Sequence, residues 1–292
     1  MINKKKYLDY NTYLRNTFGC KVHKVVVDAG FSCPNRDGSL SFGGCIYCNE
    51  KGSGAGKGNV SIKDQVLKGV ACVGKLCKAK KFVVYFQSFS NTHAPVQVLE
   101  EKYKQALCHK DIVGLAIGTR PDCIDDDKLA LLNDIGEDYD VWIEYGLQSC
   151  HNKTLKLINR HHSFEQFLLA IAKTKKFKNI KICAHIIFGL PGETQQDMLK
   201  TVKMLAPIGL DGIKFHSLYV EKNTEIEKIY TEKPFCLMSM DEYVDIVCKA
   251  IKLLPKDIVF QRLTGECLKE NLIAPKWLLE KQTVLTKINF NL

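Results

Sequence analysis

Six short segments rich in β-branched and aromatic residues alternate along the chain with segments of helical periodicity. The predicted strands are residues 22–29, 82–88, 112–118, 140–147, 180–188 and 211–219. The predicted helices between them, in which apolar residues recur three and four positions apart, are residues 62–78, 96–109, 126–135, 152–173 and 194–206. Repeated β-α units favour an α/β fold with a parallel sheet, open or rolled into a barrel, and right-handed crossovers.

Unusual polar segments come directly after the predicted strands rather than after the predicted helices. They are residues 33–38, 87–93, 119–122, 148–149 and 189–194. Because the carboxyl ends of parallel strands meet at one edge, these segments predict a single functional face. Candidate substrate contacts on it are Ser88, Asn91, Thr92, His93, Thr119, Arg120 and Asp122. For His93 an exposed loop position is the simpler interpretation.

The ends of the chain predict two additions to this core. Residues 6–18 predict an N-terminal capping helix, and residues 240–255 and 275–288 predict C-terminal helices with a short strand near 257–263 between them. We therefore expect an N-terminal helix in residues 1–20, a barrel core in residues 21–220 and a C-terminal helical extension in residues 221–292, packed on the barrel. A chain of 292 residues that is 46% hydrophobic can bury one core of this size.

Cysteine content and charge suggest a compartment and a partner. The 13 cysteines are odd in number, and no apolar signal-peptide core follows the lysine-rich start, so we expect a reducing cytoplasm without disulfides. No apolar run approaches the roughly 18 residues of a membrane span, so no membrane partner is expected. The net charge of +10 is compatible with RNA, but only 5 of the 42 basic residues are arginine, and a lysine-rich background explains the excess equally well. The densest clusters, Lys75–Lys81 and Lys173–Lys181, also suit solvated helix ends.

Three cysteines, Cys33, Cys45 and Cys48, lie in the glycine-rich loop after the first predicted strand. The two-residue gap between Cys45 and Cys48 lets their thiolates converge on one soft centre, and the turn residues before them let the loop bring Cys33 back. Three thiolates predict a metal centre with one open position. A cube of iron and sulfide held in this way keeps one iron free for an exogenous ligand.

Structural zinc is the main alternative for this loop. Closed zinc sites use four ligands, usually in two close pairs, and only one close pair is present here. Cys20 precedes the first strand and is expected at its opposite end, while Cys72 and Cys77 suit one face of a helix. Inert buried cysteines are the other alternative, and most of the remaining ten cysteines are expected to be core or incidental thiols.

Together, these motifs resemble radical S-adenosylmethionine enzymes, in the branch related to the Elongator catalytic subunit and to oxygen-independent coproporphyrinogen oxidase-like proteins. The resemblance spans nearly the whole chain and rests on Tyr10-Asn11, residues 28–31 (DAGF), 118–124 (GTRPDCI), 143–149 (IEYGLQS), 158–162 (INRHH), 188–194 (FGLPGET) and 261–266 (QRLTGE). The cysteine spacing, C-x11-C-x2-C, departs from the usual C-x3-C-x2-C and resembles a small bacterial subgroup.

The resemblance implies a partial (β/α)6 barrel with one 4Fe-4S cluster on the three cysteines. In the family the open iron binds S-adenosylmethionine, and one-electron reduction, by a donor such as flavodoxin or ferredoxin, cleaves it to methionine and a 5'-deoxyadenosyl radical that takes hydrogen from the substrate. By the same resemblance, Glu144 and Gln148 are expected to bind the ribose hydroxyls or amino group, and Arg160 the carboxylate. The alternative is that Glu144 and Arg160 pair with each other or with solvent.

Weaker assignments complete the predicted site. Gly189 and Gly192 match a family motif that approaches the adenine, although Gly-Leu-Pro-Gly is also a good turn before a helix. Lys214 and His216 alternate on the sixth strand and are the candidate catalytic residues, with an ordinary polar layer as the alternative. His161 and His162 suit either phosphate binding or a helix end.

For the substrate, the resemblance implies wobble uridine in tRNA, because the nearest relatives modify it and the subgroup resembles enzymes that act on its 5-carboxymethylaminomethyl side chain. The chain has no recognisable RNA-binding module, so tRNA would dock on the barrel rim, the lysine clusters or the C-terminal helices. A radical reaction on a small, tetrapyrrole-like metabolite is a second hypothesis. A zinc-stabilised RNA-binding protein without catalysis is a third.

Overall fold

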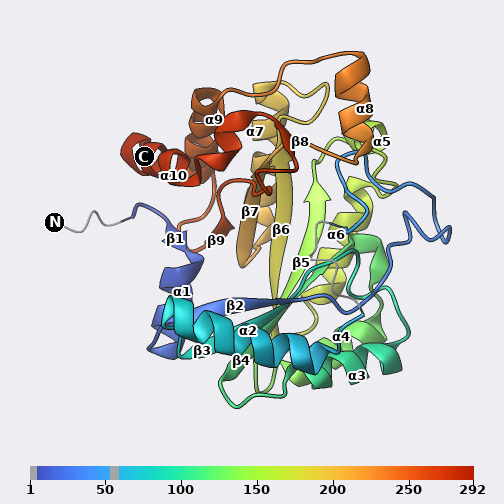
Figure 1. Ribbon diagram of the computed structural model, residues 1–292, viewed down its shortest axis with the longest axis vertical. Coiled ribbons are helices and arrows are strands. Elements are labelled where there is room, and N and C mark those ends of the chain that lie inside the picture. The colour runs from blue at the N-terminus through green and yellow to red at the C-terminus, as the bar shows by residue number, and fades with distance from the viewer. Residues whose placement is uncertain (1–4, 53–58) are drawn as a thin grey trace.

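A curled parallel sheet dominates the computed structural model, which describes residues 5–52 and 59–292 (Figure 1). Residues 1–4, the start of the predicted N-terminal part, lie outside this description. Within the described residues, eight strands pair in the order β1-β9-β7-β6-β5-β4-β3-β2, every pair parallel. These strands are β1 (Leu8–Asp9), β2 (Val22–Val27), β3 (Lys81–Phe86), β4 (Ile112–Thr119), β5 (Asp140–Gln148), β6 (Ile180–Phe188), β7 (Gly212–Ser217) and β9 (Val259–Arg262).

The six strands from β2 to β7 are those predicted from the sequence, and β2 and β1 form the two edges of the sheet. The sheet twists so strongly that β2 runs across the direction of β6 and β7 (Figure 1). The barrel is therefore partial, as expected.

Helices follow most strands, and most of them cover the outer face of the sheet. They are α1 (Tyr10–Phe18), α2 (Ile62–Cys77), α3 (Val96–Ala106), α4 (Asp126–Ile135), α5 (Asn152–Leu157), α6 (Phe164–Thr174), α7 (Gln195–Leu205), α8 (Glu225–Glu232), α9 (Met240–Leu253) and α10 (Lys281–Asn291). Side chains alternate along each strand. Val84 and Ile143 belong to the outer core with the helices, while Tyr85 and Trp142 belong to an inner cluster that α1 closes with Tyr10.

One predicted helix, residues 152–173, is two helices in the structure. Asn159 and His161 between α5 and α6 have φ of 56° and 54°, which an α-helix does not accommodate. Ser163 then starts α6 with a capping box to Gln166. The apolar periodicity continues across the break and hides it, so the capping box was the available sequence signal. Because of this break, Arg160 lies between the two helices and not within one.

The C-terminal part contributes strands as well as helices. β9, which was predicted near 257–263, joins the main sheet between β7 and β1. β8 (Val220–Glu221) and β10 (Leu272–Ala274) form a separate antiparallel pair, and a short 3-10 turn precedes α10. The three-part division of the chain stays a prediction. In the described part of the chain, no helix is long and apolar enough to cross a membrane.

Candidate active site

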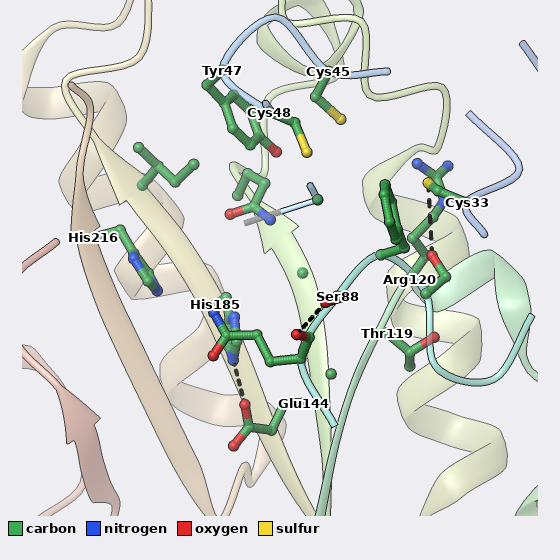
Figure 2. Close-up of a pocket in the computed structure, with 18 of the residues that line it drawn as sticks. Cys33, Cys45, Tyr47, Cys48, Ser88, Thr119, Arg120, Glu144, His185 and His216 are labelled. Atoms are coloured by element: carbon green, nitrogen blue, oxygen red, sulfur yellow. Dashed lines mark hydrogen bonds and ion pairs between the residues drawn. The ribbon is translucent and has the colours of Figure 1, made fainter. Parts of the chain in front are cut away.

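A cavity opens inside the partial barrel at the carboxyl ends of its strands (Figure 2). Cys33, Cys45 and Cys48 line one end of it, and Glu144 and His185 line the other. Further predicted residues on its wall are Ser88, Asn91, Thr119, Arg120, Gln148, Arg160, Lys214 and His216. The fold thus gathers side chains from most of the polar segments that the sequence placed at one edge.

The cysteine loop is shaped by turns and glycines. The carbonyl of Cys33 accepts from the amides of Arg36 and Asp37, and the amide of Cys48 donates to the carbonyl of Cys45 at 2.9 Å. Gly44 has φ of 79°, and a Cβ there would lie 2.6 Å from Nε of Arg36. Arg36 in turn donates to the carbonyl of Cys48 at 2.6 Å. The glycine therefore makes room for the side chain that holds the two ends of the loop together.

The same loop is hydrogen-bonded to the break between α5 and α6. Asn159 Nδ2 donates to the carbonyl of Gly44 at 2.7 Å, and Asn35 Nδ2 donates to the carbonyl of Asn159 at 2.6 Å. The amide of Ile46 donates to the carbonyl of Ile158. These hydrogen bonds hold two segments that are more than 100 residues apart in the sequence side by side. They place Arg160 next to the cysteines.

Arg160 is 7% exposed and joins the cysteine loop to β5. Its Nη1 donates to Cys45 Sγ at 3.5 Å, its Nη2 to the carbonyl of Gly146 at 2.6 Å, and its Nε to His162 Nε2 at 2.9 Å. Burial, with Arg160 and Arg120 nearby, lowers the pKa of His162 to about 3, so this imidazole is neutral and accepts. Burial alone would raise the pKa of the Cys45 thiol, but Arg160 outweighs it and lowers that pKa. Arg160 and Glu144 therefore have different partners and do not pair with each other, which was the alternative interpretation.

The position of the Arg160 side chain depends on a glycine at position 146. A Cβ there would lie 2.7 Å from Nη2 of Arg160 and 2.8 Å from Nε2 of Gln148. We expect Gly146→Ala to displace Arg160. If Arg160 holds the cofactor carboxylate, as the resemblance implies, S-adenosylmethionine binding weakens about tenfold, since one hydrogen bond to a charged group contributes about 1.5–3 kcal/mol. Equilibrium binding to the reconstituted protein measures this effect. Gly74→Ala is the matched control because its Cβ meets Phe82 at an ordinary 3.5 Å; equal affinity in both variants would contradict the assignment.

Glu144 is fully buried in a network of donors. Lys24 Nζ donates to its Oε1 at 3.1 Å, and His185 Nε2 contacts its Oε2 at 3.0 Å. Lys214 Nζ also binds Oε2 and lies 3.2 Å from the hydroxyl of Tyr85. Although burial alone would raise it, Lys214 and Lys24 hold the pKa of Glu144 well below its usual range. Both carboxylate oxygens are therefore occupied by protein donors.

Several polar groups on the cavity wall have no hydrogen-bond partner within the described residues. Those on residues that line the cavity are Tyr47 Oη, Asn91 Oδ1, Arg120 Nη1, His216 Nε2 and Ser217 Oγ, and all of them are buried. The rest of the Arg120 guanidinium is held by Asp122, with bonds of 2.9 and 2.8 Å. Buried polar groups are normally satisfied, so these atoms suit a polar ligand.

The thiols themselves suit a cluster better than a single closed ion. Among the described residues, no group of three or more His, Cys, Asp or Glu side chains is arranged to hold one metal ion. Cys33 Sγ accepts from Ser90 at 3.8 Å, and Cys45 Sγ accepts from Asn35 at 3.6 Å as well as from Arg160. Three thiols on one cavity wall, two of them with such donors, fit a 4Fe-4S cluster.

Other predicted residues lie off the cavity. Gly189 and Gly192 are not among the described residues that line the cavity. Both have positive φ and form the turn before α7. Thr92 is buried and bonds Thr119, and His93 contacts Asp37 at 3.0 Å. His161 is exposed and bonds its neighbour Asn159.

Some site residues were not anticipated from the sequence. They are Lys24, Tyr47, Tyr85, His185 and Arg262. The signal for Tyr85 and His185 is alternation, because each shares the inward phase of its strand with Val83 or Cys183 of the inner cluster. Lys24 comes from β2 at one edge of the sheet and Arg262 from β9, next to the other edge, and no local pattern connects them.

The two lysine clusters lie at the other end of the sheet. Residues 75–81 lead from α2 into the start of β3, and residues 173–181 lead from α6 into the start of β6. Because the strands are parallel, both clusters are at the amino ends of the strands, opposite the cavity. They therefore do not flank its mouth.

Comparison with known proteins agrees with this geometry. The chain is 40% identical to the protein YtqA of Bacillus subtilis (strain 168) over 289 residues, which cover 98% of this chain and 89% of that protein. Over 166 residues, 56% of this chain and 30% of the other, it is 26% identical to a tRNA uridine(34) acetyltransferase of Methanocaldococcus infernus. The solved structure of Elp3 from Methanocaldococcus infernus, with an N-terminal deletion, shares the fold at a TM-score of 0.69 and 18% identity, covering 92% of this chain and 63% of that one.

Family models cover most of the sequence. A model described as the Radical_SAM C-terminal domain matches residues 210–292, and a model of the radical SAM superfamily matches residues 33–205. The second match takes in all three cysteines of the loop and most of the cavity wall. The chain therefore belongs to the radical SAM superfamily, whose members are enzymes that use a 4Fe-4S cluster and S-adenosylmethionine.

Proposed function

We propose that this radical SAM enzyme acts on wobble uridine in tRNA, at its 5-carboxymethylaminomethyl side chain. The observation that carries the substrate is the similarity of more than half of the chain to an enzyme named for uridine 34 of tRNA. The net charge of +10 is compatible with a polyanion. We place the reaction in the cytoplasm, with an electron donor such as flavodoxin or ferredoxin.

Cys33, Cys45 and Cys48 would hold the cluster, because they are the thiols that share the cavity wall with Arg160. When bound, the cluster and S-adenosylmethionine together supply hydrogen-atom abstraction by a 5'-deoxyadenosyl radical. Arg160 would orient the carboxylate of S-adenosylmethionine from beside Cys45, since a planar guanidinium can donate two parallel hydrogen bonds. Gln148, on the same wall at the end of β5, would bind its amino group or ribose.

Glu144 was assigned to S-adenosylmethionine by the resemblance, and its surroundings favour another role. Both of its oxygens already accept from Lys24, Lys214 or His185. A carboxylate can accept about four hydrogen bonds, so a cofactor hydroxyl would have to share these oxygens with the lysines. A positioning role, in which Glu144 orients Lys214, needs no further donor.

Gly189 and Gly192 support the proposal less than the sequence suggested. They shape a turn that buries Leu190 against Ile46 of the cysteine loop, so their support for the site is indirect. We therefore propose that residues of the cavity wall, and not these glycines, contact the adenine.

RNA docking is proposed for the rim of the cavity and the neighbouring C-terminal part. The lysine clusters at 75–81 and 173–181 are at the opposite end of the sheet and would be too far from a uridine that enters the cavity. A gel-shift titration with tRNA at increasing salt should show electrostatic binding. Charge reversal at the rim is expected to weaken binding more than charge reversal in either cluster.

The substrate is tested by comparing nucleosides from the tRNA of cells with and without this protein. We expect the cells without it to accumulate tRNA bearing 5-carboxymethylaminomethyluridine and to lose the product made from it. Wild-type protein should restore the product, and the Cys45→Ala variant should not. An unchanged nucleoside profile would rule out wobble uridine as the substrate.

A further inference from the structure

The inner end of the cavity carries more positive than negative charge. Among the described residues that line it, Glu144 is the one carboxylate, while Lys214 and Arg262 are both present. Lys24 lies directly behind Glu144 and shares it with Lys214. Arg262 pairs with Glu266 at 3.2 Å, a carboxylate that Lys281 also binds. Two lysines therefore share a single carboxylate, which leaves one positive charge in excess.

This excess charge is buried, and burial of an unbalanced charge is costly. Lys214 is 2% exposed. Burial lowers its pKa to about 7, an effect that Glu144 opposes and Lys24 reinforces. A ligand anion beside Lys214 would offset the desolvation of the ammonium and stabilise its charged form.

An unused hydrogen-bond group lies on the same strand. His216 Nε2 is buried on the cavity wall, on the same face of β7 as Lys214, and has no partner within the described residues. The rings of His216 and His185 lie 5.7 Å apart. Burial keeps both of these imidazoles neutral and lowers the pKa of His185 to about 4. His185 uses its single N–H on Glu144, so His216 is the imidazole of this pair that can offer an N–H to a ligand.

We propose that Lys214 and His216 form an anion subsite at the inner end of the cavity, which binds a carboxylate of the substrate. This inference rests on the proposed function and adds the group by which the substrate is recognised. A carboxylate carries one negative charge and matches the excess, whereas a phosphate monoester carries about −1.5 to −2 and would exceed it. Glu144 and Lys24 position Lys214 from the other side.

The test compares two nucleosides that differ by one charge: 5-carboxymethylaminomethyluridine, which carries the carboxylate, and its amide, 5-carbamoylmethylaminomethyluridine. Binding to the anaerobic, cluster-loaded protein is measured by calorimetry, with uridine 5'-monophosphate as the phosphate probe. The variants are Lys214→Met and the double variant Lys214→Met with Glu144→Gln. The double variant removes both buried charges and keeps the test usable if the single variant fails to fold. Lys228→Met, on the exposed surface of α8, is the control.

Wild-type protein and Lys228→Met should bind the acid at least tenfold more tightly than the amide, and both Lys214 variants should lose this preference. Equal binding of acid and amide by wild-type protein, or no binding of the acid at millimolar concentration, would overturn the subsite. If the monophosphate bound more tightly than the acid and this binding depended on Lys214, the subsite would be a phosphate site and the carboxylate proposal would be wrong. The proposed function fails separately, in the nucleoside profile of cellular tRNA.

Discussion

Replacing Cys45 by alanine is expected to remove the cluster and reduce S-adenosylmethionine cleavage at least about 100-fold. Cys45 is buried and accepts hydrogen bonds from Asn35 and Arg160, so its sulfur lies at the centre of the network that joins the loop to β5. Loss of one thiolate from a site that has three leaves too few protein ligands to hold four irons. Iron and sulfide content and 5'-deoxyadenosine formation after anaerobic reconstitution measure the result.

Cys72→Ala is the matched control for this change. The sequence suggested that Cys72 faces the core, but it is exposed on α2. We expect this variant to keep its iron and its activity. An equal loss of iron in the two variants would move the cluster away from the loop.

Arg160→Ala is expected to weaken S-adenosylmethionine binding about 10- to 100-fold while most of the iron is retained. The guanidinium donates to the cysteine loop, to the carbonyl of Gly146 and to His162, and a hydrogen bond to a charged group contributes about 1.5–3 kcal/mol. Cofactor affinity measured by equilibrium dialysis, together with iron content, separates binding from cluster loss.

Arg160→Lys tests the geometry of the guanidinium rather than its charge. A lysine keeps the positive charge but cannot reproduce the planar pair of donors, so we expect an intermediate affinity. Wild-type affinity in Arg160→Ala would remove this residue from the cofactor site. Loss of iron in that variant would instead assign it to the support of the cluster.

The strands and the functional edge were predictable because both depend on local patterns. β-branched runs identified all six central strands, and the polar segments after them identified the edge at which the cavity opens. The cysteine spacing, with the motifs around it, indicated the superfamily that the family models confirm. This assignment also replaces the hypothesis of a non-catalytic zinc protein.

Other features were hidden because they depend on pairs that are distant in the sequence. The break at residues 158–163 is held by bonds from Asn159 to Gly44 and from Asn35 to Asn159, across more than 100 residues. The remaining ten cysteines were expected to be core or incidental thiols. Of these, Cys123, Cys183 and Cys248 are buried, and the rest are partly or fully exposed.

The sequence by itself determined the alternation of strands and helices, the edge that carries chemistry and the three thiols, because each is written in neighbouring residues. Only the tertiary structure decided that Glu144 lies between Lys24 and Lys214, and that Arg160 reaches Cys45. The physical reason is the curl of the sheet, which brings inward side chains of β2, β5, β6 and β7 together. Charges that are far apart along the chain then share one buried space, where each sets the ionisation of the others.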